Sequence, residues 1–186
     1  LCGHGMDLQS VLGVVGQLQA VPGRTQIISA DTDDVLAIVD YAHTPDALEK
    51  VLEAVRERCV GRLWCVFGCG GNRDQGKRSQ MGFVASTYAD RVVVTTDNPR
   101  YEEPLAIIGD ILAGCDKANI EIEIDRAKAI YHAIDMAEPG DAVVIAGKGH
   151  ETYQEILNKC YSFSDITTTR DALHIRRQKF TGARAL

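Results

Sequence analysis

The sequence predicts an α/β fold in which a mostly parallel sheet is covered by helices on both faces. Short apolar runs typical of buried strands alternate with segments of helical periodicity along most of the chain. Such alternation is typical of parallel sheets, because helices form the crossovers between neighbouring strands. The 186 residues, 45% hydrophobic and 25% charged, suffice for one domain with a sizeable core.

The elements follow from the positions of apolar residues and of Pro and Gly. Strands are predicted over residues 26–29, 35–40, 62–67, 92–95, 120–124 and 142–146. Helices are predicted over residues 45–57, 79–88, 104–113, 126–136 and 167–179. Thr44 is a suitable N-cap for the first of these helices, with Pro45 at the first helical position. A further helix, over residues 9–19, is separated from the rest by a break at residues 21–24.

Composition excludes several classes of protein. The net charge of −6 argues against nucleic acid as the main partner, and no apolar run approaches the length that spans a membrane. The six cysteines form no CxxC pair, so we expect reduced thiols in a cytoplasmic protein rather than a zinc site. The chain begins at Leu1 rather than Met, and we expect a fragment or a processed product.

Four polar loops each follow a predicted strand. They cover residues 40–43, 68–77, 97–100 and 147–151. In a parallel sheet these loops gather along one edge, which is where open α/β sheets bind ligands. Their shared position indicates an active site more strongly than any single motif does.

The loop at residues 97–100 offers an anion, an amide, a rigid turn residue and a guanidinium. Arg100 suits a carboxylate, which it can clamp with two parallel hydrogen bonds, and Asp97 suits an ammonium. Pro99 restricts the loop and lowers the entropy lost when it orders. This set fits a zwitterionic ligand. The alternative is an ordinary turn, in which Asp97 or Asn98 caps the next helix and Arg100 points into solvent.

The glycine-rich loop matches neither a dinucleotide fingerprint nor a Walker A motif. The GxGxxG spacing is absent, and the string G-x-x-x-x-G-K that ends at Lys77 is followed by Arg78 instead of Ser or Thr. One interpretation is a mobile loop in which Arg73, Lys77 and Arg78 meet anions, and the other is a solvated basic loop.

The loop at residues 147–151 permits close approach of its backbone to a ligand. Glu151 can accept an ammonium and Lys148 can face a phosphate, or Glu151 can instead begin a helix and interact with its dipole. His43 and His150 are candidate bases, but no Ser or Cys nucleophile is placed beside either, so covalent catalysis has no support.

Taken together, the strings at residues 40–48, 68–78, 97–100 and 147–151 closely resemble the Mur ligases of bacterial peptidoglycan synthesis. The branch they match adds diaminopimelate as the third amino acid of the peptide. The resemblance implies a Rossmann-like C-terminal domain. It also implies a meso-diaminopimelate site made of Arg73, Asp97, Asn98, Pro99, Arg100, Gly147 and Glu151. ATP contacts are implied for Arg24, Asp40 and His43, although Thr25 and Gln26 depart from the Gly-Arg-Met-Glu string that the family has around that arginine.

The implied reaction is ATP-dependent amide formation through an acyl phosphate. Its substrates are ATP, meso-diaminopimelate and UDP-N-acetylmuramoyl-L-alanyl-D-glutamate, with no nucleic acid or membrane as partner. The family's P-loop, magnesium ligands and carbamylated lysine belong to a central domain, and none of them is found in this sequence. We therefore expect residues 1–22 to be the tail of the central ATPase domain and a linker, and residues 23–186 to be the C-terminal amino-acid-binding domain.

It follows that we expect no catalytic residue and no metal site in this chain. ATP and Mg2+ would serve the full-length enzyme, and the chain alone would bind no cofactor and catalyse no ligation. Two alternatives remain. The first is a lysine-adding ligase of the same family, against which Arg100 argues because lysine has no distal carboxylate. The second is a nucleotide-binding Rossmann-like module without a ligase role, which the missing GxGxxG disfavours.

Overall fold

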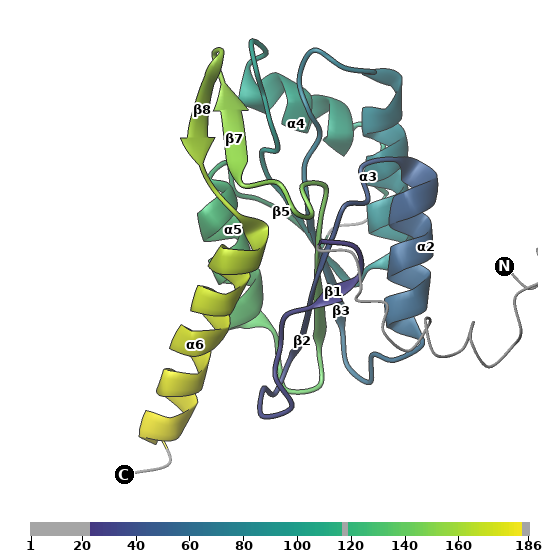
Figure 1. Ribbon diagram of the computed structural model, residues 1–186. Helices are drawn as coiled ribbons and strands as arrows, with labels where there is room; N and C mark the ends of the chain where they lie inside the picture. Colours follow the sequence, from purple (N-terminus) through teal and green to yellow (C-terminus); the bar gives the residue numbers. More distant parts are fainter. Residues whose placement is uncertain (1–22, 117–118, 184–186) are drawn as a thin grey trace, which may run out of the picture.

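A computed structural model describes residues 23–116 and 119–183 (Figure 1). The helix and linker predicted within residues 1–22 lie outside these ranges. Six strands form one sheet in the order β1-β2-β6-β3-β4-β5. They are β1 (Gln26–Ile27), β2 (Leu36–Asp40), β3 (Leu63–Phe67), β4 (Arg91–Val94), β5 (Ile120–Ile122) and β6 (Ala142–Ala146). Only β1, at one edge, runs antiparallel to its neighbour, so the predicted mostly parallel sheet is confirmed.

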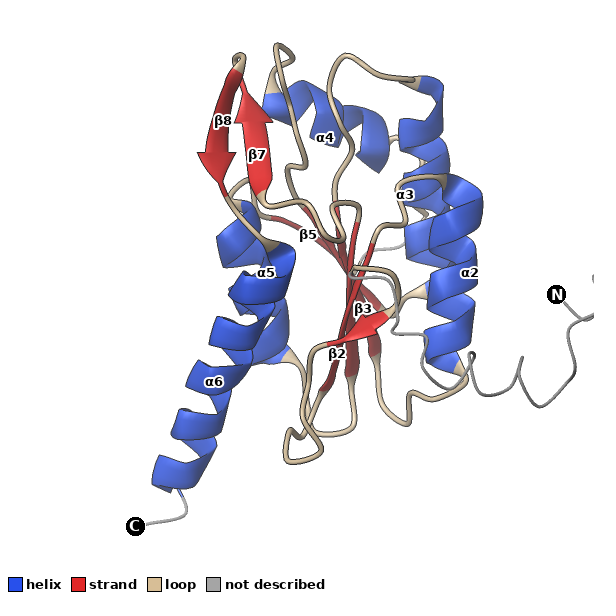
Figure 2. Ribbon diagram, in the orientation of Figure 1, coloured by secondary structure: helices blue, strands red, loops and turns tan. Residues whose placement is uncertain are grey.

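Helices cover both faces of this sheet, as predicted (Figure 2). On one face lie α2 (Pro45–Arg56), α3 (Gly76–Tyr88) and α4 (Pro104–Leu112), and on the other lie α5 (Arg126–Met136) and α6 (Asp165–Ala183). The central strand β3 is buried along its whole length, because its side chains point alternately to the two faces. Phe67 packs into the core under α2, α3 and α4, whereas Val66 packs into the core under α5.

Several element boundaries follow the predicted local signals, and others differ. The Thr44 side chain accepts a hydrogen bond from Ala47 N at 3.4 Å, so the predicted cap of α2 is confirmed. The helix α3 begins three residues earlier than predicted, at Gly76. The helix α6 begins at Asp165, whose buried carboxylate forms an ion pair with Arg126 at 2.8 Å. Ser164, the residue before Asp165, accepts a hydrogen bond from Thr167 N at 3.4 Å, so a local capping contact also lies at this helix start.

A β-hairpin that the sequence analysis did not predict follows the loop at residues 147–151. It comprises β7 (Tyr153–Ile156) and β8 (Lys159–Ser162), and it stands beside the β4–α4 loop at the carboxyl edge of the sheet (Figure 1). Leu157 and Asn158 form its turn, with φ values of 47° and 60°. Positive φ in both turn residues is typical of two-residue hairpins, but Leu-Asn is far from the usual Asn-Gly signal. The hairpin is therefore hard to recognise from sequence.

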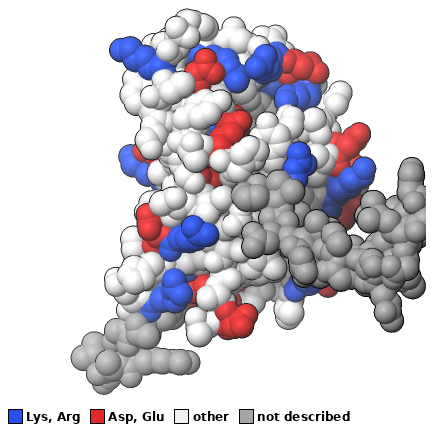
Figure 3. Space-filling view, viewed as in Figure 1, with Lys and Arg blue, Asp and Glu red and all other residues white. Residues whose placement is uncertain are grey.

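Charged side chains of both signs are mixed over the face shown in Figure 3. Within the described residues, no helix is both long and apolar enough to cross a membrane.

Candidate functional site

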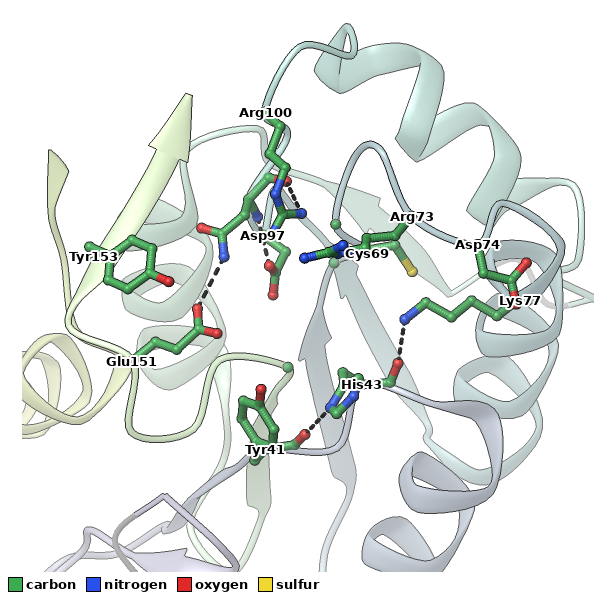
Figure 4. Close-up of a pocket in the computed structure, with 14 residues that line it drawn as sticks. Tyr41, His43, Cys69, Arg73, Asp74, Lys77, Asp97, Arg100, Glu151 and Tyr153 are labelled. Atoms are coloured by element: carbon green, nitrogen blue, oxygen red, sulfur yellow. Dashed lines mark hydrogen bonds between the residues drawn. The ribbon is translucent and has the colours of Figure 1, made fainter. Parts of the chain in front are cut away.

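A pocket of about 460 Å3 lies at the carboxyl ends of the parallel strands, and we call it the strand-edge pocket (Figure 4). The loops after β2, β3, β4 and β6 line it, together with the first residue of β7. The prediction that four polar loops meet at one edge is thus confirmed. Its wall contains these residues singled out from the sequence: His43, Arg73, Asp97, Asn98, Arg100, Gly147 and Glu151. Arg24, Asp40 and Pro99 do not line it.

The β4–α4 loop holds Arg100 in the pocket wall, with its side chain only 19% exposed. Its Nε forms an ion pair with the Glu155 carboxylate at 2.9 Å, and its Nη1 donates to the carbonyl of Gly71 at 2.8 Å. Among the described residues, Nη2 has no hydrogen-bond partner, so this nitrogen is left for an incoming anion. The alternative of a helix-capping turn is wrong, because Glu103 is the N-cap of α4 and Arg100 does not point into solvent.

The backbone of Arg100 is also fixed by the hairpin. Arg100 N donates to Glu155 O at 3.1 Å, and Leu157 N donates to Arg100 O at 2.7 Å. These bonds hold Arg100 at φ 53°, a left-handed conformation that residues with a side chain rarely adopt. A strained conformation persists only where its surroundings enforce it, and such positions are frequent in ligand sites.

Glu151, Lys148 and Asn98 form a buried polar group at the back of the pocket. Glu151 Oε2 accepts from Lys148 Nζ at 2.8 Å and from Asn98 Nδ2 at 3.0 Å, as Figure 4 shows for the second contact. Burial alone would raise the pKa of Glu151, but its contacts with Lys148 and Asn98 outweigh burial and hold the pKa below its usual value. Glu151 is therefore an anion at neutral pH, and it is 21% exposed.

Two predictions about this loop are wrong. Lys148 does not face a phosphate, because its side chain is fully buried and its ammonium is held by Glu151 and by Asn98 Oδ1 at 3.0 Å. Glu151 does not begin a helix either, since the chain continues into β7. The buried lysine instead fixes the carboxylate that faces the pocket.

Two glycines allow the loops to approach one another closely. A Cβ on Gly71 would lie 1.9 Å from Pro99 O, so the glycine-rich loop packs against the β4–α4 loop only without a side chain there. Gly147 has φ 118°, and a Cβ on it would lie 2.9 Å from a carboxylate oxygen of Asp97. These glycines thus serve the contact between loops as well as access for a ligand.

The basic residues of the glycine-rich loop have different environments. Arg73 is exposed and lines the pocket. Lys77 Nζ donates to His43 O at 2.8 Å. Arg78 does not meet external anions as the sequence suggested, because its side chain is 1% exposed and it pairs with Glu102 at 2.9 Å and Asp110 at 2.8 Å. Only Arg73 is therefore placed as a second guanidinium of the pocket.

The residues singled out for ATP gather around Tyr41, at one side of the pocket. The Arg24 guanidinium lies 5.6 Å from the centroid of the Tyr41 ring, and His43 meets the same ring edge-on at 4.7 Å. Asp40 Oδ1 accepts from Ala42 N at 2.7 Å. Its Oδ2 accepts from both the backbone and the hydroxyl of Thr25, at 2.6 and 3.2 Å. Tyr41 and His43 line the pocket, whereas Arg24 and Asp40 lie beside its wall.

Several residues that build the site were not among those predicted from the sequence. Tyr153 and Glu155 belong to the unpredicted hairpin, so no local signal connected them with the pocket. Arg126 donates to the carbonyls of Thr96 and Ala146, at 3.2 and 2.9 Å, and so ties together the strand ends that carry two of the pocket loops.

Cys69 also lines the pocket, but it is not a nucleophile. Its burial raises the pKa of the thiol to about 12, so it stays protonated at neutral pH. The other cysteines in the described residues are free thiols as well.

A family model described as Mur ligase, glutamate ligase domain, matches residues 23–149. The UDP-N-acetylmuramoyl-L-alanyl-D-glutamate–2,6-diaminopimelate ligase of Coxiella burnetii is 51% identical over 174 residues. This match covers 93% of the chain and 35% of that ligase. The chain thus spans about a third of the length of this relative.

Solved structures agree with the sequence matches. A structure of UDP-N-acetylmuramoyl-L-alanyl-D-glutamate–2,6-diaminopimelate ligase superposes with a TM-score of 0.79 and 44% identity, covering 94% of this chain and 36% of that one. A folylpolyglutamate synthase/dihydrofolate synthase from Yersinia pestis, complexed with AMPPNP and a manganese ion, has a TM-score of 0.56 at 18% identity, covering 88% of this chain and 32% of that one. The second likeness is one of fold alone.

Proposed function

This chain belongs to the Mur ligase family, and we propose that it is the amino-acid-binding C-terminal portion of an ATP-dependent ligase. The ligase adds meso-diaminopimelate to UDP-N-acetylmuramoyl-L-alanyl-D-glutamate in peptidoglycan synthesis. The observation that carries this proposal is the charge pattern of the strand-edge pocket. Two guanidiniums, Arg73 and Arg100, and the Lys77 ammonium line a pocket large enough for a small amino acid, together with three carboxylates, Asp74, Asp97 and Glu151.

This pattern is complementary to a molecule with amino and carboxylate groups at both ends. Arg100 binds one carboxylate of diaminopimelate through the nitrogen that the protein leaves free, and Arg73 binds the other. Asp97 and Glu151 receive ammonium groups, while Asn98, Pro99 and Gly147 give the loops their shape. Charge-assisted hydrogen bonds of this kind combine strength with directional selectivity.

A lysine-adding ligase is the alternative within the family, and the pocket disfavours it. Lysine lacks the distal carboxylate, so its binding would leave Nη2 of Arg100 without a hydrogen-bond partner in a partly buried wall. The other alternative, a nucleotide-binding module without a ligase role, does not account for the paired cations and anions of the pocket.

The group around Tyr41 fits the nucleotide. A carboxylate has about four acceptor positions, and Asp40 uses three of them on Thr25 and Ala42, which leaves one for a ribose hydroxyl. The exposed guanidinium of Arg24 suits a phosphate, and His43 lies beside it on the same ring.

The bound nucleotide and Mg2+ would activate a carboxylate of the muramoyl dipeptide as an acyl phosphate in the complete enzyme. Within residues 23–116 and 119–183, no three His, Cys, Asp or Glu side chains are grouped to hold a metal, so we assign no magnesium ligand to the described part of the chain. The contribution of this chain is to position the incoming amine and to neutralise charge.

We assign residues 23–186 to this amino-acid-binding domain and residues 1–22 to the end of the preceding ATPase domain and a linker. We place the enzyme in the cytoplasm, because the thiols within residues 23–116 and 119–183 are free and its proposed substrates include ATP.

Phosphate release by the complete ligase tests the proposal. With ATP and the UDP-linked dipeptide present, release should depend on meso-diaminopimelate and be much slower with lysine. Equal rates with the two amino acids, or no dependence on either, would contradict it. The 186-residue chain alone should release no phosphate under the same conditions, since its sequence contains no P-loop.

A further inference from the structure

We propose that Glu155 is a positioning residue that sets the selectivity of the strand-edge pocket by orienting the Arg100 guanidinium. This inference rests on the function proposed above. Glu155 belongs to the β7–β8 hairpin and is not among the residues proposed to contact the amino acid.

Glu155 holds the β4–α4 loop at three points. Its carboxylate forms an ion pair with Arg100 Nε at 2.9 Å, its carbonyl accepts from Arg100 N at 3.1 Å, and its backbone N–H donates to Asn98 Oδ1 at 2.9 Å. The side chain is 25% exposed, so the ion pair is partly shielded from water. One residue thus fixes both the backbone and the side chain of Arg100.

These contacts leave the guanidinium one orientation. Glu155 engages Nε, and Gly71 O engages Nη1 from the opposite loop. Nη2 is the nitrogen without a partner among the described residues, and Figure 4 shows the Arg100 side chain reaching into the pocket near Asp97. Without the Glu155 carboxylate, Gly71 would be the main remaining restraint, and the long arginine side chain would regain rotamer freedom.

Among the described residues, the Glu155 carboxylate has no hydrogen-bond or ion-pair partner besides Arg100. The hairpin is anchored independently by Gln154, whose amide donates to Asp97 O at 2.6 Å and to Thr96 Oγ1 at 2.9 Å. A negative charge beside Arg100 also weakens, by repulsion, the attraction of a ligand carboxylate. The Glu155 carboxylate therefore favours anion binding only by orienting the Arg100 guanidinium.

The consequence is a selective effect on diaminopimelate. Ordering a rotamer-rich side chain during binding weakens affinity by an amount equivalent to roughly two- to tenfold. In a variant without the Glu155 carboxylate, the Arg100 side chain becomes ordered only when diaminopimelate binds, so the affinity for diaminopimelate is the one that drops. Lysine does not use Arg100, so its binding should not change.

The test measures kcat and KM for meso-diaminopimelate and for lysine in the complete ligase. Glu155→Ala should raise KM for diaminopimelate roughly two- to tenfold with little change in kcat, and leave lysine unchanged. Glu155→Gln keeps an acceptor at the same reach and should behave like the unmodified enzyme. Glu155→Asp keeps the charge but is one methylene shorter, and should behave like the alanine variant. Glu138→Ala is the matched control, because it removes the carboxylate of an exposed Arg62–Glu138 pair near the start of β6.

The Gln and Asp variants decide the matter even if the alanine variant fails to fold. A normal Asp variant and an impaired Gln variant would overturn the proposal, because charge rather than orientation would then matter. An equal rise in KM for both amino acids would also overturn it, since the effect would be structural. If the unmodified enzyme shows no preference for diaminopimelate, the proposed function itself fails. A preference for diaminopimelate that is unchanged in both Glu155→Ala and Glu155→Asp refutes this inference alone.

Discussion

Replacement of Arg100 by alanine should narrow the selectivity of the complete ligase for diaminopimelate over lysine. Arg100 is the guanidinium that the pocket offers to the distal carboxylate, which lysine lacks. The variant should therefore lose activity with diaminopimelate and change little with lysine. No other described residue combines a partly buried guanidinium in the pocket wall with a nitrogen left free for a ligand.

The structure sets the size of this effect. Truncating one partner of a buried, hydrogen-bonded charge pair typically costs about 2–5 kcal/mol. Arg100 is 19% exposed, and Glu155 and Gly71 already use two of its nitrogens, so the lower part of that range applies. A loss of about 2–3 kcal/mol corresponds to roughly a 30- to 150-fold drop in kcat/KM for diaminopimelate.

The assay is kcat/KM for both amino acids, measured as phosphate release. Arg62→Ala is the matched control, because it removes an exposed arginine from an ion pair at the start of β3, away from the pocket. Arg100→Lys should recover only part of the loss, since a single ammonium nitrogen cannot contact Glu155, Gly71 and the ligand in the way that the three guanidinium nitrogens can. If Arg100→Ala lowers kcat/KM by the same factor for both amino acids, the reasoning about selectivity is refuted.

Three further predictions concern the neighbouring residues. Arg73→Ala should lower kcat/KM for diaminopimelate and for lysine alike in the same assay, because both amino acids have the carboxylate assigned to Arg73. A drop in kcat/KM confined to diaminopimelate would reverse the roles of the two arginines. Asp40→Ala should raise KM for ATP more than KM for the amino acid, since its remaining acceptor position is assigned to the ribose, and the opposite ranking would move Asp40 out of the nucleotide site. Glu151 has a lowered pKa when folded, so its contribution to stability is complete above its unfolded pKa of about 4.3 and is lost as pH falls through the lower folded value. Denaturant unfolding should therefore show the gap between the unmodified protein and Glu151→Gln shrinking below about pH 4.3, and a gap that is constant with pH would contradict this assignment.

Local sequence signals were enough to predict the sheet and the helices. The apolar run of β3 and the Thr44–Pro45 start of α2 depend on residues close together in the chain, and both are confirmed. The placement of the four polar loops at one edge follows from parallel strand direction alone. The resemblance to Mur ligases, carried by those same loops, is confirmed by the family match.

What the sequence determined, then, was the type of each element and the edge at which the polar loops meet. The tertiary structure decided which charged groups remain available to a ligand. Arg78 and Lys148 looked equally fit to bind anions, yet one is neutralised by Glu102 and Asp110 and the other by Glu151. The physical reason is that the partner of a charged side chain is set by which groups lie near it in the folded chain, and not by its neighbours in the sequence. Contacts such as Arg100 with Glu155 join separate loops and strands, and they form only once the chain has packed.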